Sequence, residues 1–182
     1  WFRGRPPVPH CPRGRKHRRV MLVDTHSHLQ DKAFDTDREQ VLTRALAEVE
    51  WLVVVGDTVA SSRAAASLVR PGVYATAGIH PHHAAGVGPA DLEAVSSLLD
   101  APGVVALGEI GLDYHYEFSP RSEQITIFEQ QLELAARLQK PVVIHCREAH
   151  KDMTAILQNG AAHMMGGIMH CFPGGVDFAE QC

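Results

Sequence analysis

Long apolar runs are absent from this sequence of 182 residues, although 45% of its residues are hydrophobic. No stretch approaches the roughly 20 apolar residues that a membrane-spanning helix needs, and none resembles a secretory signal peptide. Apolar residues in this proportion predict one domain with a substantial buried core. We therefore expect a protein that has no membrane partner.

Cysteine is scarce, with four residues that are scattered along the chain and never spaced as CxxC. This pattern is unlike a disulfide framework and indicates free thiols in a reducing compartment, which we take to be the cytoplasm. Cys146 and Cys171 each follow a histidine in an apolar run. We expect both to be buried as small hydrophobic residues.

The sequence also lacks the short motifs of several enzyme classes. It has no GxGxxG or P-loop to cradle a nucleotide phosphate, and no GxSxG turn to present a catalytic serine. None of its cysteines has the surroundings of a catalytic thiol. These absences exclude the nucleotide-dependent and nucleophilic enzymes that rely on such motifs.

Acidic residues are missing from the first 20 residues, which hold seven of the 17 Lys and Arg residues and four prolines. The prolines rule out a continuous helix, and a basic tail can bind nucleic acid. We expect residues 1–20 to be a disordered extension upstream of a natural start at Met21. Residues 21–182 carry ten basic and 21 acidic side chains, a net charge of −11. This charge argues against a broad nucleic-acid-binding face.

From Met21 onward, apolar β-like runs alternate with amphipathic helical segments. The expected strands are Leu22–His28, Trp51–Gly56, Val73–Ile79, Val104–Ile110, Pro141–His145 and Gly167–Phe172. The expected helices are Thr36–Glu48, Ser61–Val69, Pro89–Leu99, Gln124–Leu138 and His150–Leu157. The alternation is typical of a parallel sheet covered by helices, either an open doubly wound sheet or a β/α barrel.

Two histidines end the first expected strand. Because side chains alternate along a strand, His26 and His28 point to the same side and can share a metal ion. Imidazole nitrogen is a common ligand of zinc and similar cations. The alternative is that both histidines make ordinary hydrogen bonds at a strand end.

Further potential ligands end the later strands. Glu109 lies in an apolar run, where a carboxylate is costly to bury unless it is paired or bound to metal. We expect it to bridge two metal ions rather than to pair with an arginine. His145 and His170 hold equivalent points of consecutive units, which favours ligation over a structural role. Side chains from so many strand ends meet only at the mouth of a closed barrel, so we predict a TIM-type β/α barrel.

Two more residues are candidates for substrate binding. Arg147 can clamp a phosphate oxygen, or else pair at the surface with Glu148 or Asp152. We group Asp113 with it, although this acid can also orient a ligand histidine or cap the following loop.

A cluster of histidines follows the third expected strand. One interpretation of this cluster is another metal site, but we favour a more modest interpretation. We expect His80 at the barrel mouth, where it binds substrate or acts as a catalytic acid, with Glu109 as the second catalytic residue. His82 and His83 are expected to be solvated loop residues.

Five segments, in this order, resemble the successive signatures of the TatD-type metal-dependent hydrolases, deoxyribonuclease-like members of the amidohydrolase superfamily. They are Val23-Asp24-Thr25-His26-Ser27-His28, Gly78-Ile79-His80-Pro81-His82, Gly108-Glu109-Ile110-Gly111-Leu112-Asp113-Tyr114, Lys140-Pro141-Val142-Val143-Ile144-His145-Cys146-Arg147 and His170-Cys171-Phe172. The resemblance implies a TIM-type barrel with two divalent metal ions (Mg²⁺, Mn²⁺ or Zn²⁺) at its mouth. It assigns their ligation to His26, His28, Glu109, His145 and His170.

The resemblance also implies a final ligand, an aspartate in a Glu-Thr-Asp segment that activates the metal-bound water. This sequence contains no such segment. It has six βα units, whereas a complete barrel has eight in roughly 250 residues. We therefore expect residues 21–182 to form an incomplete, C-terminally truncated metallohydrolase domain, with unpaired edges on its first and sixth strands.

The expected function is hydrolysis of DNA phosphodiester bonds by a metal-activated water, at short or single-stranded ends and without an obligate protein partner. One alternative is an amidohydrolase that cleaves a small C–N or ester substrate. A PHP-type phosphoesterase shares the HxH strand, but the Gly-Glu-Ile-Gly-Leu-Asp segment fits that family poorly. The third alternative is a catalytically inactive fragment that at most binds metal.

Overall fold

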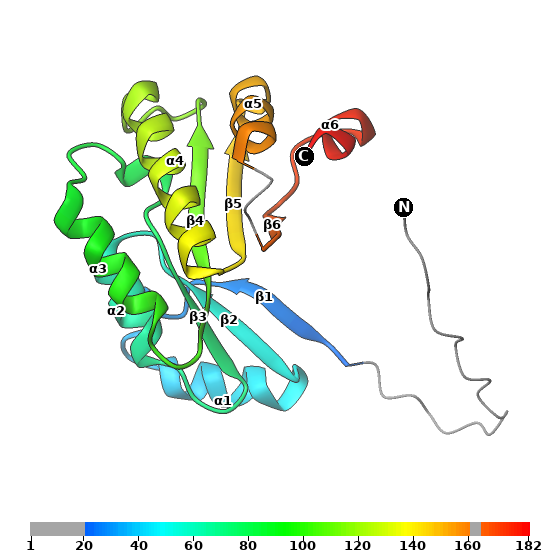
Figure 1. Cartoon of the computed structure of the whole chain (residues 1–182). Helices are drawn as coiled ribbons and strands as arrows, with labels where there is room; N and C mark the ends of the chain where they lie inside the picture. Colours follow the sequence, from blue (N-terminus) through cyan, green and yellow to red (C-terminus); the bar gives the residue numbers. More distant parts are fainter. Residues whose placement is uncertain (1–20, 161–164) are drawn as a thin grey trace, which may run out of the picture.

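The computed structural model describes residues 21–160 and 165–182, in which six parallel strands form one sheet curled into half of a barrel (Figure 1). The strands are β1 (Val23–Ser27), β2 (Trp51–Val55), β3 (Val73–Ala77), β4 (Val104–Asp113), β5 (Val142–Arg147) and β6 (Gly167–Met169). Each strand pairs with the next one along the chain. The predicted β/α-barrel architecture is confirmed in this form, with β1 and β6 at the two edges. The expected extension, residues 1–20, lies outside the described residues.

Helices connect the strands, and α2 to α5 pack against the sheet (Figure 1). The helices are α1 (Arg38–Glu48), α2 (Val59–Ser67), α3 (Pro89–Leu99), α4 (Arg121–Leu138), α5 (His150–Gly160) and α6 (Val176–Gln181). Two short 3-10 turns precede α1 and α3, at Lys32–Phe34 and Pro81–His83. All five predicted helices are present, with ends that shift by a few residues, whereas α6 and both turns were not predicted.

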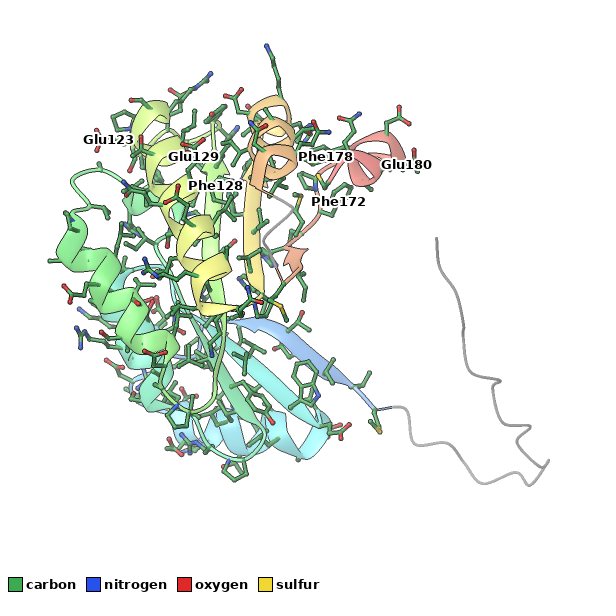
Figure 2. All side chains as sticks on the ribbon, viewed as in Figure 1. Glu123, Phe128, Glu129, Phe172, Phe178 and Glu180 are labelled. Atoms are coloured by element: carbon green, nitrogen blue, oxygen red, sulfur yellow. The ribbon has the colours of Figure 1, made fainter. Side chains whose placement is uncertain are left out.

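The core lies between the sheet and its covering helices. Phe128 of α4 faces the sheet and is almost completely buried, whereas its neighbour Glu129 points to solvent (Figure 2). The predicted apolar face of this helix is confirmed, since Ile127, Leu132 and Leu134 are also buried. Such a stripe on a long helix supplies most of the packing that holds a helix onto a sheet.

The concave face of the sheet is apolar and open. It surrounds a hollow of about 410 Å³ whose lining includes Trp51, Tyr74, Val143 and Ile168. Tyr74 and Ile168 are exposed there. No helix among the described residues is long and apolar enough to cross a membrane.

The two cysteines that were expected to be buried have different environments. Cys146 on β5 is buried, as predicted, and burial raises the pKa of its thiol to about 11. Cys171 is exposed, so that expectation was wrong. The sixth strand ends at Met169, earlier than expected, and Cys171 lies in the turn that follows, with a positive φ of 42°.

One buried side chain ties α4 to the segment that leads into the histidine cluster. Gln131 is fully buried, and its Oε1 accepts a hydrogen bond from the backbone N–H of Ile79 at 2.8 Å. Its Nε2 donates to the carbonyl oxygen of the same residue at 3.0 Å. Both backbone groups of Ile79 are satisfied by one glutamine, which positions the backbone next to His80.

We expect the Gln131→Ala substitution to lower the free energy of unfolding by about 2–5 kcal/mol, because it leaves two buried backbone groups without partners. Chemical denaturation followed by circular dichroism measures the change. Gln130→Ala, at the exposed neighbouring position, is the matched control and should stay within about 0.5 kcal/mol of wild type. Equal destabilisation of the two variants would contradict this account.

Candidate metal centre

Polar side chains converge at the carboxyl ends of the strands, on one rim of the half-barrel. They come from β1, β4 and β5 and from the segments that follow β1, β3 and β6. The residues are His26, His28, His80, Glu109, His145 and His170. This rim is where parallel β/α barrels place their chemistry, because the connecting loops and strand ends meet there.

A bulge in β4 aims Glu109 into this cluster. Gly108 pairs with Val143 and Ile110 with Ile144, so Glu109 is an extra residue on its strand. Bulges of this kind redirect a side chain. Gly108 has a φ of +157°, and a Cβ there would lie 2.6 Å from the carbonyl oxygen of Val143. Only glycine therefore allows β5 to approach the bulged strand this closely.

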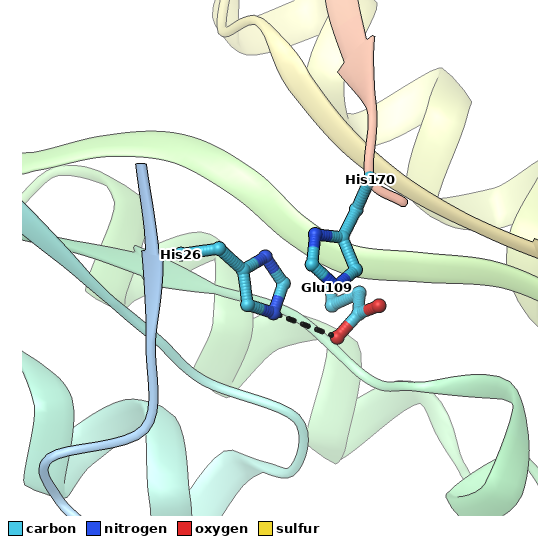
Figure 3. Close-up of side chains that lie close together, drawn as sticks. All are labelled: His26, Glu109 and His170. Carbon is cyan, nitrogen blue, oxygen red and sulfur yellow. Dashed lines mark ion pairs between the residues drawn. The ribbon is translucent and has the colours of Figure 1, made fainter. Parts of the chain in front are cut away.

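One group of ligand atoms gathers around the Oε2 atom of Glu109 (Figure 3). The Nε2 atom of His26 lies 3.4 Å from this oxygen and 3.2 Å from the Nε2 atom of His28. The ring of His170 stacks on that of His26, with centroids 3.5 Å apart. The first and last strands of the half-barrel thus bring their histidines together although the two strands do not pair.

These spacings would fit a cation held between His26, Glu109 and His170. Two atoms that each lie about 2.1 Å from a tetrahedral zinc ion are about 3.4 Å apart. The Nδ1 atom of His28 lies 3.0 Å from the carbonyl oxygen of Val55, which can only accept, so Nδ1 carries the proton. The Nε2 lone pair of His28 therefore faces the Nε2 atom of His26. A second-layer carbonyl that fixes a histidine in this way is typical of metal ligands.

His145 lies on the other side of Glu109. Its Nδ1 atom is 3.1 Å from Oε1 of Glu109, and its Nε2 atom is 3.0 Å from Oδ2 of Asp113. Burial alone would lower the pKa of His145, but the two carboxylates raise it. Burial alone would likewise raise the pKa of Glu109, yet hydrogen bonds from His145 and His26 hold it well below its usual range. Glu109 is therefore an ionised carboxylate that faces imidazoles with both oxygens.

Asp113 orients His145 and also caps the loop after β4, so both of its structural interpretations fit. Its Oδ2 atom also accepts from Nε2 of His82 at 2.9 Å, and its Oδ1 atom accepts from the backbone N–H groups of His115 and Tyr116. Burial opposes ionisation, but these donors lower the pKa of Asp113 to about 2. The side chain is fully buried and its oxygens are engaged. This environment does not favour the substrate contact with which we had grouped it.

His80 is buried with its Nε2 atom 4.0 Å from Oε1 of Glu109. Its Nδ1 atom accepts the backbone N–H of His82 at 3.1 Å, so the neutral ring carries its proton on Nε2. Although its nitrogen lies close enough to Glu109 and His145 to share a metal ion, a protonated Nε2 cannot ligate one. Burial and His145 lower the pKa of His80 to about 3, so the neutral ring can donate a hydrogen bond from Nε2.

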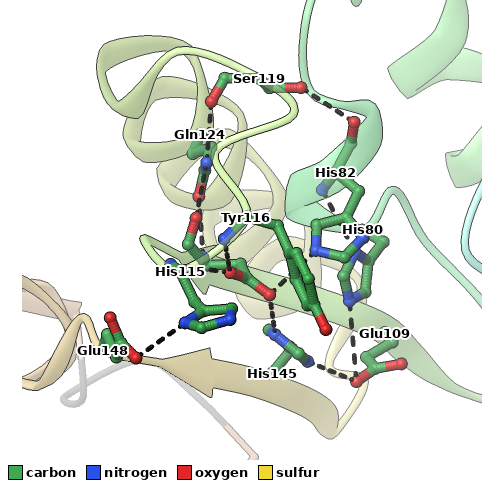
Figure 4. A network of polar contacts seen from close by, with 10 residues as sticks. His80, His82, Glu109, His115, Tyr116, Ser119, Gln124, His145 and Glu148 are labelled. Atoms are coloured by element: carbon green, nitrogen blue, oxygen red, sulfur yellow. Dashed lines mark hydrogen bonds and ion pairs between the residues drawn. The ribbon is translucent and has the colours of Figure 1, made fainter.

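The histidines after His80 differ from each other. His83 is exposed, as expected of a solvated loop residue. His82 is half-buried and donates to Asp113, so the expectation of a free loop side chain was wrong for it. Figure 4 shows it within the polar network that runs from Ser119 and Gln124 to Glu109. The contact of His82 was not predicted because Asp113 is 31 positions away in the sequence.

Arg147, the predicted phosphate clamp, is exposed at the end of β5. Its guanidinium carbon lies 4.8 Å from the ring centroid of Tyr116. Among the described residues, Glu148 pairs with His115 and Asp152 accepts a hydrogen bond from Tyr114, so neither acid engages Arg147 as the alternative had it.

A parallel half-barrel with histidines and a buried carboxylate at its strand ends defines the site type of the metal-dependent hydrolases with a β/α barrel. A family model described as "TatD related DNase" matches residues 23–182. The chain belongs to this family.

The relatives that the chain resembles carry related names. It is 42% identical over 165 residues to the "Uncharacterized metal-dependent hydrolase YabD" of Bacillus subtilis, covering 89% of this chain and 65% of the relative. It is 40% identical to the "3'-5' ssDNA/RNA exonuclease TatD" of a Pantoea species, covering 88% of this chain and 64% of the relative. The chain thus spans less than two thirds of the length of these proteins.

Solved structures show the same architecture. The TatD homologue YJJV from Escherichia coli K12 superposes with a TM-score of 0.80 at 30% identity, over 88% of this chain and 63% of the other. A TatD family hydrolase from Entamoeba histolytica gives a TM-score of 0.77 at 22% identity, over 88% of this chain and 61% of the other. The latter likeness supports the fold alone.

We expect the Asp113→Asn substitution to weaken the binding of Mn²⁺ or Zn²⁺ by about 10- to 100-fold. The reason is that Asp113 accepts the proton on Nε2 of His145 and thereby fixes the orientation of the ring. Isothermal titration calorimetry measures the affinity. Asp91→Asn, at a residue whose carboxylate accepts from the backbone N–H of Gly88, is the control and should bind as wild type does. An unchanged affinity of a folded Asp113→Asn protein would remove Asp113 from this role.

Proposed function

We propose that this chain supplies the metal centre of a divalent-metal-dependent nuclease that hydrolyses phosphodiester bonds at the ends of single-stranded DNA or RNA. The observation that carries the proposal is the placement of Glu109, a buried ionised carboxylate between two sets of imidazoles. The relatives named as 3'-5' ssDNA/RNA exonucleases support the choice of substrate. The free thiols among the described residues agree with the cytoplasmic location that we also propose.

We propose two cation sites, one at each oxygen of Glu109. Oε2 lies beside His26, which groups with His170 and has His28 next to it, whereas Oε1 faces His145. Glu109 would therefore help to hold both cations, together with the imidazoles on each side. The donor set of imidazole nitrogen and carboxylate oxygen fits zinc and manganese, with magnesium as the harder alternative.

The side chains around the centre bind the phosphate of the substrate and orient the metal ligands. A bound divalent cation supplies hydroxide near neutral pH by lowering the pKa of a water ligand, and it polarises the phosphoryl oxygen. His80 donates its Nε2 proton as a hydrogen bond toward the phosphate, Arg147 pairs with a phosphate oxygen, and Asp113 keeps His145 in orientation. The net charge of −11 over residues 21–182 leaves few other sources of phosphate affinity.

We expect His26→Ala, Glu109→Gln and His145→Ala each to lower kcat for metal-dependent cleavage by at least about 100-fold. Circular dichroism and thermal melts check that the variants stay folded. His83→Ala, which removes an exposed histidine of the same rim, is the matched control and should keep the wild-type rate. Retained activity in one of the three variants would remove that residue from the centre.

Together with the final aspartate and the last two βα units that the family resemblance implies, we expect these residues to cleave single-stranded DNA and RNA in the presence of Mg²⁺, Mn²⁺ or Zn²⁺. We expect cleavage to stop when EDTA removes the metal. Product analysis on end-labelled oligonucleotides measures the reaction, with duplex DNA and small amide and ester substrates assayed in parallel. Cleavage of the amide or ester alone would instead favour an amidohydrolase. Metal binding without any turnover would favour an inactive metal-binding chain.

A further inference from the structure

Two aromatic side chains stand exposed on the loop between β4 and α4. Tyr116 is 47% exposed and Phe118 is 66% exposed. Their planes are nearly parallel, at 11°, with centroids 5.4 Å apart. Apolar rings that face solvent together, rather than singly, mark a binding surface more often than chance exposure does. We call this pair of residues the aromatic platform.

Hydrogen bonds to the backbone of this loop fix the position of the aromatic platform. Asp113 accepts the backbone N–H of Tyr116, and Gln124 donates to the carbonyl oxygens of Asp113 and Ser119. Ser119 is buried and donates to the carbonyl oxygen of His82. The exposure of the rings is therefore a property of an anchored backbone. By contrast, Tyr114 of the same loop is half-buried and packs against the core.

The aromatic platform lies next to the candidate metal centre. The ring of His82 meets both of its rings edge-on, with centroid distances of 5.5 Å to Tyr116 and 4.8 Å to Phe118. The His82 ring lies 6.1 Å from the His145 ring, and both histidines bond the same oxygen of Asp113. Figure 4 shows Tyr116 beside His82 and His145. One histidine thus separates the platform from a proposed metal ligand.

A positive charge completes this surface. The guanidinium of Arg147 lies 4.8 Å from the centroid of Tyr116, within the range of a cation–π contact. The nearby acids are already engaged, since Glu148 pairs with His115 and Glu117 with Arg121. Stacked flat rings with one arginine are the combination by which proteins hold an unpaired base and its phosphate.

We propose that Tyr116 and Phe118 stack an unpaired nucleobase of the substrate next to the phosphate that is cleaved. The proposal rests on the function proposed above and names the part of the site that selects single strands. A base in a duplex is already stacked on its neighbours and cannot lie on the platform. Since every base has a π-face, binding by stacking tolerates any sequence. It also supplies affinity that the acidic surface of this chain does not supply through phosphate contacts.

The test measures how the rings and a single base depend on each other. Fluorescence anisotropy gives the Kd of a short single-stranded phosphorothioate DNA, and of versions in which one terminal base at a time is replaced by an abasic site. We expect one abasic position to weaken binding to wild type by at least about fivefold. Phe118→Ala and Tyr116→Ala should show a similar loss with the intact DNA and little further loss with that abasic DNA.

Three further variants separate stacking from other effects. Phe118→Trp keeps a flat ring and should retain the wild-type Kd, whereas Phe118→Leu keeps apolar bulk without a ring and should lose affinity as Phe118→Ala does. Tyr74→Ala removes an exposed ring at the opposite, amino end of the strands and should bind as wild type does. Wild type should bind matched duplex DNA more weakly than it binds the single strand. Phe118→Ala should bind the duplex and the single strand with equal affinity.

The outcomes distinguish this proposal from the function on which it rests. If wild type cleaves single strands with metal but the ring and abasic effects are additive, the platform is overturned and the nuclease stands. If the rings and the base are coupled but no metal-dependent cleavage occurs, the platform stands and the nuclease is overturned. If the protein binds no single-stranded DNA, the platform is overturned.

Discussion

The structure depends on one buried carboxylate that is ionised because imidazoles surround it. An isolated charge in the interior is expensive, so Glu109 is stable there only in the company of His26, His145 and, by our proposal, cations. Because its two oxygens face opposite sides, they demand partners from strands that are far apart in the sequence. The curl of the sheet brings these strand ends to one rim. The bulge in β4 and the glycine before Glu109 then give the carboxylate its direction.

A second layer of buried polar side chains makes this arrangement rigid. Asp113 binds His82 and His145, Gln124 binds the backbone on both sides of the following loop, and Gln131 binds both backbone groups of Ile79. Every side-chain nitrogen and oxygen atom of these three residues takes part in a hydrogen bond, and such networks specify one geometry. The same layer that orients the imidazoles also anchors the loop that exposes Tyr116. The metal binding and the base stacking that we propose therefore share one framework.

The fold and most of the site could be predicted from the sequence because their signals are local. Apolar strands and helix periodicity predicted the architecture, and polar residues at strand ends predicted which side chains converge at the rim. The role of His82 could not be predicted, because it depends on Asp113, a residue 31 positions away that the fold brings to 2.9 Å. The exposure of Cys171 was missed because β6 ends at Met169, two residues before it, and the chain turns there. Tyr116 and Phe118 escaped notice because aromatic spacing alone does not reveal exposure.

Anomalous X-ray diffraction tests most directly whether Glu109 holds one cation at each of its two oxygens, as we propose. Crystals of the chain grown with Mn²⁺ or Zn²⁺ should give two anomalous peaks at the rim, each within about 2.0–2.3 Å of one oxygen of Glu109. The Oε2 peak should also contact His26 and His28, and the Oε1 peak should contact His145. Fully loaded crystals with a single peak, or with peaks that touch neither oxygen, would contradict it.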